Sequence, residues 1–243
     1  LLPAGVGGAL ANVALLMCGR VPVTLNWTAG PAALRSAVAQ CGIRTVVTAT
    51  EFTKRVNLAE LGLAPGPSAP HLLYLDELRA RMGLGRRLSA ALAAELLPGR
   101  LLVRFCGGRR RGVDELCTVV FSSGSTGEPK GVMLSHANVM SDVEGMSQVF
   151  AAGSGDRLAG VLPFFHSFGF TATLWLPLVK RLGVVYHPNP LEGRAVGAMV
   201  REFRATLLLA TPTFLRLYTR AVLPGDFGSL RQVVVGAEKL REA

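Results

Sequence analysis

The sequence lacks the residue clusters that hold structural metals or disulfide frameworks. Its four cysteines, Cys18, Cys41, Cys106 and Cys117, form no CxxC pair, and none lies at metal-ligand spacing from a histidine. The sequence therefore predicts no metal site. Cysteines without a pairing pattern are typical of proteins from a reducing compartment, and we expect a cytoplasmic protein.

No apolar run is long enough for a membrane span. Residues 1–17 carry no charge, but glycines, Pro3 and Asn12 interrupt them, Arg20 follows, and no basic segment precedes them. Because a span needs about 20 apolar residues and a signal peptide needs a basic start, we predict a buried helix here. The chain opens on Leu1 instead of Met, so we expect its ends to be boundaries of a fragment.

Lysine is scarce, with four among 26 basic residues, and acidic residues are almost absent from residues 79–111. This segment holds nine arginines and one acid, Glu95, a net charge of +8. Clustered positive charge attracts an acidic protein, an anionic membrane or a nucleic acid. The plainer interpretation is a solvated loop in an arginine-rich sequence, and we expect no nucleic-acid partner.

Short apolar runs of strand length alternate with segments of helical spacing in this chain of 243 residues. The alternation predicts an α/β fold with mostly parallel sheets flanked by helices, in two packed subdomains. The predicted strands are Val21–Leu25, Thr45–Thr48, Leu72–Leu75, Leu101–Phe105, Thr118–Phe121, Gly160–Pro163, Val184–His187, Leu207–Ala210 and Gln232–Val235. The predicted helices are Pro31–Cys41, Ser135–Val149, Leu191–Phe203 and Pro212–Val222.

Glycine and arginine clusters break this alternation from Leu84 to Arg111. They predict a linker at about residues 84–115. The first α/β subdomain is expected at residues 1–105 and the second at residues 106–243.

One motif has the composition of a phosphate-binding loop. A short apolar strand runs into SSGSTGEPKG at residues 122–131. The glycines allow successive N–H groups to converge on an anion, the hydroxyls add donors, and Lys130 adds a mobile positive charge. The predicted phosphate-binding residues are Ser122, Ser123, Gly124, Ser125, Thr126, Gly127 and Lys130.

Two other interpretations of this motif are weaker. A Walker A loop requires Gly-Lys followed by Ser or Thr, whereas Lys130 lies between Pro129 and Gly131. A flexible surface loop shares the Gly/Ser/Thr composition. However, the fixed order of strand, SSGSTG, Pro-Lys-Gly and helix is much more specific than composition alone.

The motif resembles the signature loop of the adenylate-forming superfamily, which includes acyl-CoA synthetases, luciferases and nonribosomal-peptide adenylation domains. The resemblance continues through residues 14–26, PFFHSFGF at 163–170 and VGAEKL at 235–240. A narrower resemblance, carried also by LWLPL at 174–178 and DFGSLR at 226–231, is to the acyl-[acyl-carrier-protein] synthetase domain often fused to 2-acylglycerophosphoethanolamine acyltransferase.

The resemblance implies an incomplete N-terminal domain of an acid-thiol ligase that uses ATP and Mg²⁺. A fatty acid would become an acyl-adenylate and then pass to the thiol of acyl carrier protein or coenzyme A. Lys130 and His166 are the implied catalytic residues. The implied adenine- and acyl-binding residues are Gly236, Ala237 and Glu238, and the implied acyl-pocket residues are Phe165, His166, Phe168 and Trp175.

Several alternatives stay open. By themselves, the aromatic residues and His166 are better explained as core packing. Amino-acid activation would require a buried carboxylate for the ammonium group, and residues 164–169 contain none. A non-catalytic binding module could instead use the arginine-rich segment on an acidic carrier protein or a membrane. The resemblance also implies further segments downstream, so we expect no turnover by this chain alone, and membrane association through a fused or neighbouring domain.

Overall fold

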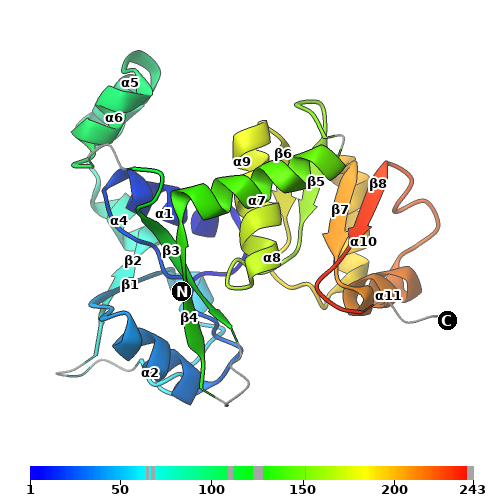
Figure 1. Cartoon of the computed structure of the whole chain (residues 1–243), viewed down its shortest axis with the longest axis horizontal. Helices are drawn as coiled ribbons and strands as arrows, with labels where there is room; N and C mark the ends of the chain where they lie inside the picture. The colour runs from blue at the N-terminus through cyan, green and yellow to red at the C-terminus, as the bar shows by residue number, and fades with distance from the viewer. Residues whose placement is uncertain (64–65, 67–68, 109–111, 123–127, 151, 240–243) are drawn as a thin grey trace. The chain divides into compact units, whose positions relative to one another are not determined.

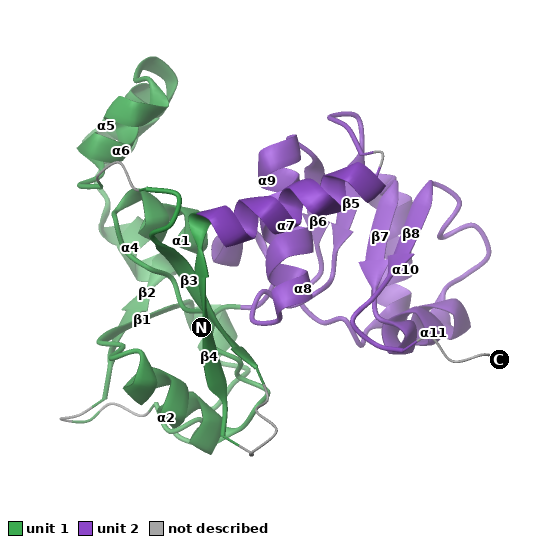
Figure 2. Cartoon of the chain, viewed as in Figure 1, with its two compact units in different colours: residues 1–2, 10–136 green, residues 3–9, 137–243 purple. Residues whose placement is uncertain are grey.

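The structure, a computed structural model, describes residues 1–63, 66, 69–108, 112–122, 128–150 and 152–239 (Figure 1). These residues form an α/β fold of mostly parallel strands, as the sequence predicts. The chain divides into two compact units (Figure 2). Unit 1 comprises residues 1–2 and 10–136, and unit 2 comprises residues 3–9 and 137–243. This division differs from the subdomain boundary predicted near residue 105.

Unit 1 contains one parallel and one antiparallel two-stranded sheet. The parallel pair is β1 (Thr45–Thr48) with β2 (His71–Tyr74), and the antiparallel pair is β3 (Leu116–Ser122) with β4 (Lys130–Ser135). The prediction of a strand at Val21–Leu25 is wrong, because only Val23 makes an isolated bridge, to Val119. Strand β4 was not predicted, because its residues were assigned to the phosphate motif and the start of a helix.

The core of unit 1 lies beneath two helices, α2 (Pro31–Gln40) and α3 (Thr50–Thr53). Leu34 of α2 and Phe52 of α3 are buried with Val46 of the parallel sheet. Pro31 opens α2 at a position where the missing N–H costs nothing. The predicted helix in residues 1–17 is present as α1 (Val6–Met17), although Val6 and Leu10 are exposed and not buried as expected.

Residues 75–105 form three helices, where the sequence predicts a linker from about residue 84 and a strand at Leu101–Phe105. They are α4 (Leu75–Arg81), α5 (Leu84–Leu96) and α6 (Gly99–Phe105). The strand prediction for Leu101–Phe105 is therefore wrong, and most of residues 84–105 of the predicted linker region are helical. A short apolar run fits either a strand or a helix, and here Leu102, Val103 and Cys106 are half-buried at helical spacing.

Unit 2 is built on a four-stranded sheet with the order β6-β5-β7-β8, in which all neighbours are parallel. Its strands are β5 (Arg157–Gly160), β6 (Gly183–Tyr186), β7 (Leu207–Ala210) and β8 (Gln232–Val235). Its helices are α7 (His136–Val149), α8 (Ser167–Gly169), a π-helix at Phe170–Trp175 that Figure 1 does not label, α9 (Leu176–Lys180), α10 (Gly193–Phe203) and α11 (Pro212–Ala221). Every residue of β7 is buried, as expected for a central parallel strand.

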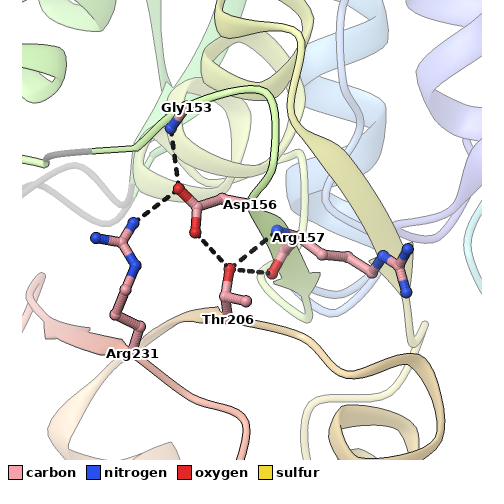
Figure 3. Close-up of polar contacts among 5 residues, drawn as sticks. All are labelled: Gly153, Asp156, Arg157, Thr206 and Arg231. Atoms are coloured by element: carbon pink, nitrogen blue, oxygen red, sulfur yellow. Dashed lines mark hydrogen bonds and ion pairs between the residues drawn. The ribbon is translucent and has the colours of Figure 1, made fainter.

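Asp156 ties together the amino ends of these strands (Figure 3). One carboxylate oxygen accepts from the Gly153 N–H at 2.9 Å and pairs with Arg231 at 2.7 Å. The other accepts from the Thr206 hydroxyl at 2.8 Å. Thr206 precedes β7 and Arg231 precedes β8, so this one carboxylate sets the relative position of three neighbouring strands.

Candidate functional site

The antiparallel hairpin of unit 1 holds the two described ends of the phosphate motif. Ser122 and Lys130 are register partners at the ends of β3 and β4, and both are exposed. Residues 123–127, which include the predicted donors Ser123, Gly124, Ser125, Thr126 and Gly127, lie outside the described residues. The pairing brings a hydroxyl and an ammonium group to the same end of the hairpin, one on each side of the loop.

Packing fixes the backbone on both sides of this loop. Val119 and Val120 are buried in β3, and a Cβ added at Gly131 would lie 3.0 Å from Val119 Cγ1 and 3.2 Å from Phe121 Cζ. The Gln40 side-chain amide donates to the Pro129 carbonyl at 2.9 Å. Lys130 therefore combines a fixed main chain with an exposed side chain, which suits a residue that must meet a polyanion.

His166 lies in a tight turn of unit 2. Its N–H donates to the Pro163 carbonyl at 3.2 Å, and its own carbonyl accepts from the Phe170 N–H at 2.8 Å. The turn requires Gly169, since a Cβ there would lie 2.1 Å from the Pro163 oxygen. The imidazole is exposed and meets the Phe165 ring edge-on at 4.7 Å between centroids.

Partial desolvation beside this ring lowers the pKa of His166 below its ordinary value of about 6.5. The imidazole is consequently neutral at pH 7. A neutral imidazole has one nitrogen that donates and one that accepts, so His166 is suited to hydrogen bonding and not to charge neutralisation.

A π-helix, Phe170–Trp175, follows this turn. The buried Thr173 hydroxyl donates to the Gly169 carbonyl at 2.6 Å, and the Tyr186 hydroxyl donates to the Thr173 carbonyl at 2.8 Å. Burial raises the pKa of Tyr186 to about 12, so it remains a donor. π-Helices are rare and occur frequently at functional sites.

The strand end after β8 meets this region within unit 2. A Cβ added at Gly236 would lie 3.5 Å from Phe168 Cζ, so the Phe168 ring lies close against the Gly236 backbone. Ala237 follows with a φ of 67°, a left-handed conformation that is costly for a residue with a side chain. Two residues predicted for separate roles, Phe168 and Gly236, are thus neighbours.

Glu238 holds the amino end of α11. Its carboxylate accepts from the Thr213 hydroxyl at 2.6 Å and from the Thr213 N–H at 3.2 Å. These hydrogen bonds, the hydroxyl first, lower the pKa of Glu238. Thr211 caps the same helix by accepting from the Phe214 N–H at 3.2 Å. This contact gives the carboxylate a structural role, and the assignment of Glu238 to the adenine or acyl group stays a prediction.

The remaining predicted pocket residues have core positions. Phe165 is buried, and Phe168 and Trp175 are partly buried against the main core cluster of unit 2. The Trp175 indole meets Phe170 at 6.2 Å between centroids. These contacts agree with the interpretation of the three aromatic residues as core packing. Their assignment to an acyl pocket stays a prediction. In the described part of the chain, no group of three or more His, Cys, Asp or Glu side chains is arranged to hold a metal ion.

Sequence reasoning missed four residues that position these features: Gln40, Tyr186, Thr211 and Thr213. The sequence Thr211-Pro212-Thr213 is a recognisable helix start, and could have indicated that this helix is capped by polar side chains. Gln40 and Tyr186 act over long separations in the chain, and no local pattern identifies such contacts.

Comparison with known proteins identifies the family. A model of the AMP-binding enzyme family matches residues 1–243, and the chain belongs to this family. A sulfoacetate–CoA ligase from Cupriavidus necator is 29% identical over 88% of this chain and 39% of its own length. A feruloyl-CoA synthase from an Amycolatopsis species is 30% identical over 51% of this chain and 26% of its own length.

The solved N-terminal domain of FACL13 from Mycobacterium tuberculosis has the same fold. It superposes with a TM-score of 0.77 at 20% identity, over 100% of this chain and 56% of that domain. The family match confirms the resemblance to adenylate-forming enzymes. The chain spans less than half the length of the two curated relatives above.

Proposed function

We propose that this chain is part of an acid-thiol ligase that activates a fatty acid with ATP. The pairing of Ser122 with Lys130 across the phosphate motif is the observation that carries this proposal. Membership of the AMP-binding enzyme family supports it.

The proposed reaction needs no covalent bond to the protein. A carboxylate oxygen of the acid attacks the α-phosphorus of ATP, the bond to the bridging oxygen breaks, and pyrophosphate leaves with the electron pair. In a second step a thiolate attacks the acyl carbon, and AMP leaves. Catalysis then consists of holding the reactants in line and neutralising phosphate charge.

Each candidate residue has a role consistent with its surroundings. Lys130 supplies a positive charge on the phosphates from a fixed backbone, and Ser122 supplies a hydroxyl donor. Neutral His166 either hydrogen-bonds the adenylate phosphate or lines the acyl channel. Gly236 and Ala237 present backbone to the adenine or the acyl group. Mg²⁺ bound with ATP would add charge neutralisation, and the nucleotide phosphates would supply its main ligands.

The acyl group and the acceptor are the finer parts of this proposal. We infer a fatty acid from the apolar residues around Phe168 and Trp175, and transfer to the phosphopantetheine thiol of acyl carrier protein or coenzyme A. The relatives include a feruloyl-CoA synthase and a sulfoacetate–CoA ligase. Aromatic or small charged acids are therefore the competing substrates. We further propose a cytoplasmic enzyme in which this chain alone does not turn over.

ATP–pyrophosphate exchange tests the proposal. A form extended through the segments that the relatives add should exchange pyrophosphate in the presence of a fatty acid. The same assay with ferulate, sulfoacetate and amino acids separates the substrate classes. Better exchange with one of these acids would overturn the fatty-acid assignment. Absence of exchange with every acid would favour the non-catalytic binding module.

A further inference from the structure

Helix α5 carries a row of exposed leucines. Leu84, Leu88, Leu92 and Leu96 are 69%, 55%, 59% and 75% exposed. Residues four apart on a helix shift by about 40°, so the row forms one stripe roughly 18 Å long. Isolated exposed leucines are ordinary, but a continuous stripe over three turns marks an interaction face. The next helix, α6, adds Leu101 and Phe105, which are 52% and 68% exposed.

Most residues of the helix pair α5–α6 are exposed to solvent. No residue of either helix is buried, and within α5 only Ala93 is as much as half-buried. Ala93 lies about 120° around the helix from the middle of the leucine stripe, so the partly covered face is the alanine face. In Figure 1 both helices extend away from the sheets of unit 1. The leucines therefore face outward without a partner among the described residues.

Unpaired arginines accompany this stripe. Arg86 and Arg87 in α5, and Arg100 and Arg104 in α6, form no ion pair within the part of the chain that the structure describes. Arg86 and Arg87 lie on the side of α5 away from the leucine stripe, about 140° and 120° from its centre in opposite directions. Glu95 is the one acidic residue of the two helices. An apolar stripe with arginines on the opposite, polar side is the pattern of helices that lie in the plane of a membrane surface.

We propose that the α5–α6 helix pair docks on an anionic lipid surface. The leucines would enter the boundary between headgroups and acyl chains, and the arginines would contact lipid phosphates. A second copy of the chain is a weaker occupant, because two surfaces of the same strong positive charge repel. An acidic carrier protein would match the arginines, but it would leave the long leucine stripe without a partner.

Vesicle flotation of the purified 243-residue chain tests this inference without ATP or any acid. Binding to phosphatidylcholine vesicles that contain phosphatidylglycerol is expected, with weak binding to phosphatidylcholine alone and loss at high salt. The double variant Arg86→Glu/Arg87→Glu should reduce the partition coefficient of the protein between vesicles and water by about tenfold or more. Leu88→Gln/Leu92→Gln, which keeps good helix formers, should also reduce it by about tenfold.

The matched control is Arg194→Glu/Arg220→Glu, which makes the same charge change at exposed residues of α10 and α11. It should bind vesicles like the unchanged chain, and circular dichroism should show equal helicity for all variants. Equal binding by the control and the α5 variants would overturn the proposal. So would binding only to an acidic carrier protein, or self-association that Leu88→Gln/Leu92→Gln removes without any vesicle binding.

Discussion

Lys130 is the residue whose chemistry depends most directly on the fold. Its main chain is paired with Ser122, and its side chain is exposed at the end of the hairpin. We expect Lys130→Ala in an active, extended form to lose about 2 to 4 kcal/mol of transition-state stabilisation, since a fixed charge on a developing anion has this magnitude. The measurement is the rate of ATP–pyrophosphate exchange at saturating fatty acid.

Lys180→Ala is the control, because Lys180 is an exposed lysine at the end of α9 and outside the candidate site. It should leave the exchange rate unchanged. An unchanged rate in Lys130→Ala would contradict the assignment of Lys130 to the phosphates.

Asp156 is a residue whose role is structural and pH-dependent. Its hydrogen bond from the Gly153 N–H, with further bonds from Thr206 and Arg231, lowers the pKa of the carboxyl group. Because the folded pKa is below the unfolded value of about 3.9, this stabilisation is present above the unfolded pKa. It is lost as the pH falls through the folded pKa. Asp156→Asn should therefore lower the free energy of unfolding by about 1 to 3 kcal/mol at pH 7.

Urea unfolding at a series of pH values measures this effect. The difference between the unchanged chain and Asp156→Asn should shrink below about pH 4, where the carboxyl group of the unfolded chain becomes protonated, and disappear below the folded pKa. Asp142→Asn, at an exposed position of α7, is the matched control and should have little effect at any pH. If both variants unfold alike at pH 7, the network in Figure 3 does not stabilise unit 2.

At the scale of elements, the turn from Pro163 to the π-helix depends on one close approach. A Cβ at Gly169 would lie 2.1 Å from the Pro163 carbonyl oxygen, and a backbone atom cannot move aside cheaply. Gly169→Ala should destabilise the protein by about 3 kcal/mol, the upper part of the range for overpacking. The same turn carries His166, so the substitution should also impair any activity.

Gly145→Ala is the matched control for this turn. Gly145 lies inside α7 with open space where a Cβ would go. The added methyl group should stabilise the helix by about 0.5 to 1 kcal/mol. Thermal unfolding followed by circular dichroism compares the two variants. A small effect of Gly169→Ala would mean that the turn is looser than the structure indicates.

The parallel strands and the helices of unit 2 were largely predictable because their signals are local. Each of β6, β7 and β8 is a short apolar run, and α10 and α11 have strong helical spacing. The sequence predicts strand β5 three residues too late, because Val161 and Leu162 remain buried after the strand has ended. An apolar run indicates which residues are buried. Because burial continues past the end of a strand, the run does not fix where the strand ends.

The failures have a different physical cause. The run Leu101–Phe105 is apolar enough for a strand but forms a helix, and length alone could not distinguish them. Strand β4 has a short apolar run of its own, but its residues also fit the phosphate motif and a helix start, and only its pairing with β3 distinguishes these assignments, a contact that the sequence does not specify. For the same reason, the candidate site residues could be named from the motifs, whereas the contacts of Glu238 with Thr213 and of Phe168 with Gly236 could not.

At the scale of the whole molecule, the chain contains only part of the length of its relatives. The sulfoacetate–CoA ligase is matched over 39% of its length, and the FACL13 domain over 56%. Among the described residues, β8 is an edge strand of the unit 2 sheet, and its Val233 is 43% exposed. An apolar strand at a sheet edge invites association with other chains.

We therefore expect extension of the chain to change both activity and stability. The 243-residue chain should show no ATP–pyrophosphate exchange with any fatty acid, because it spans less than half the length of the two curated ligases above. A form extended through the segments that the relatives add should exchange pyrophosphate, melt at a higher temperature and associate less in light scattering. Lys130→Ala in the extended form controls for contaminating enzymes. Robust exchange by the 243-residue chain itself would contradict the expectation of incompleteness, whereas inactivity of both forms would count against a ligase.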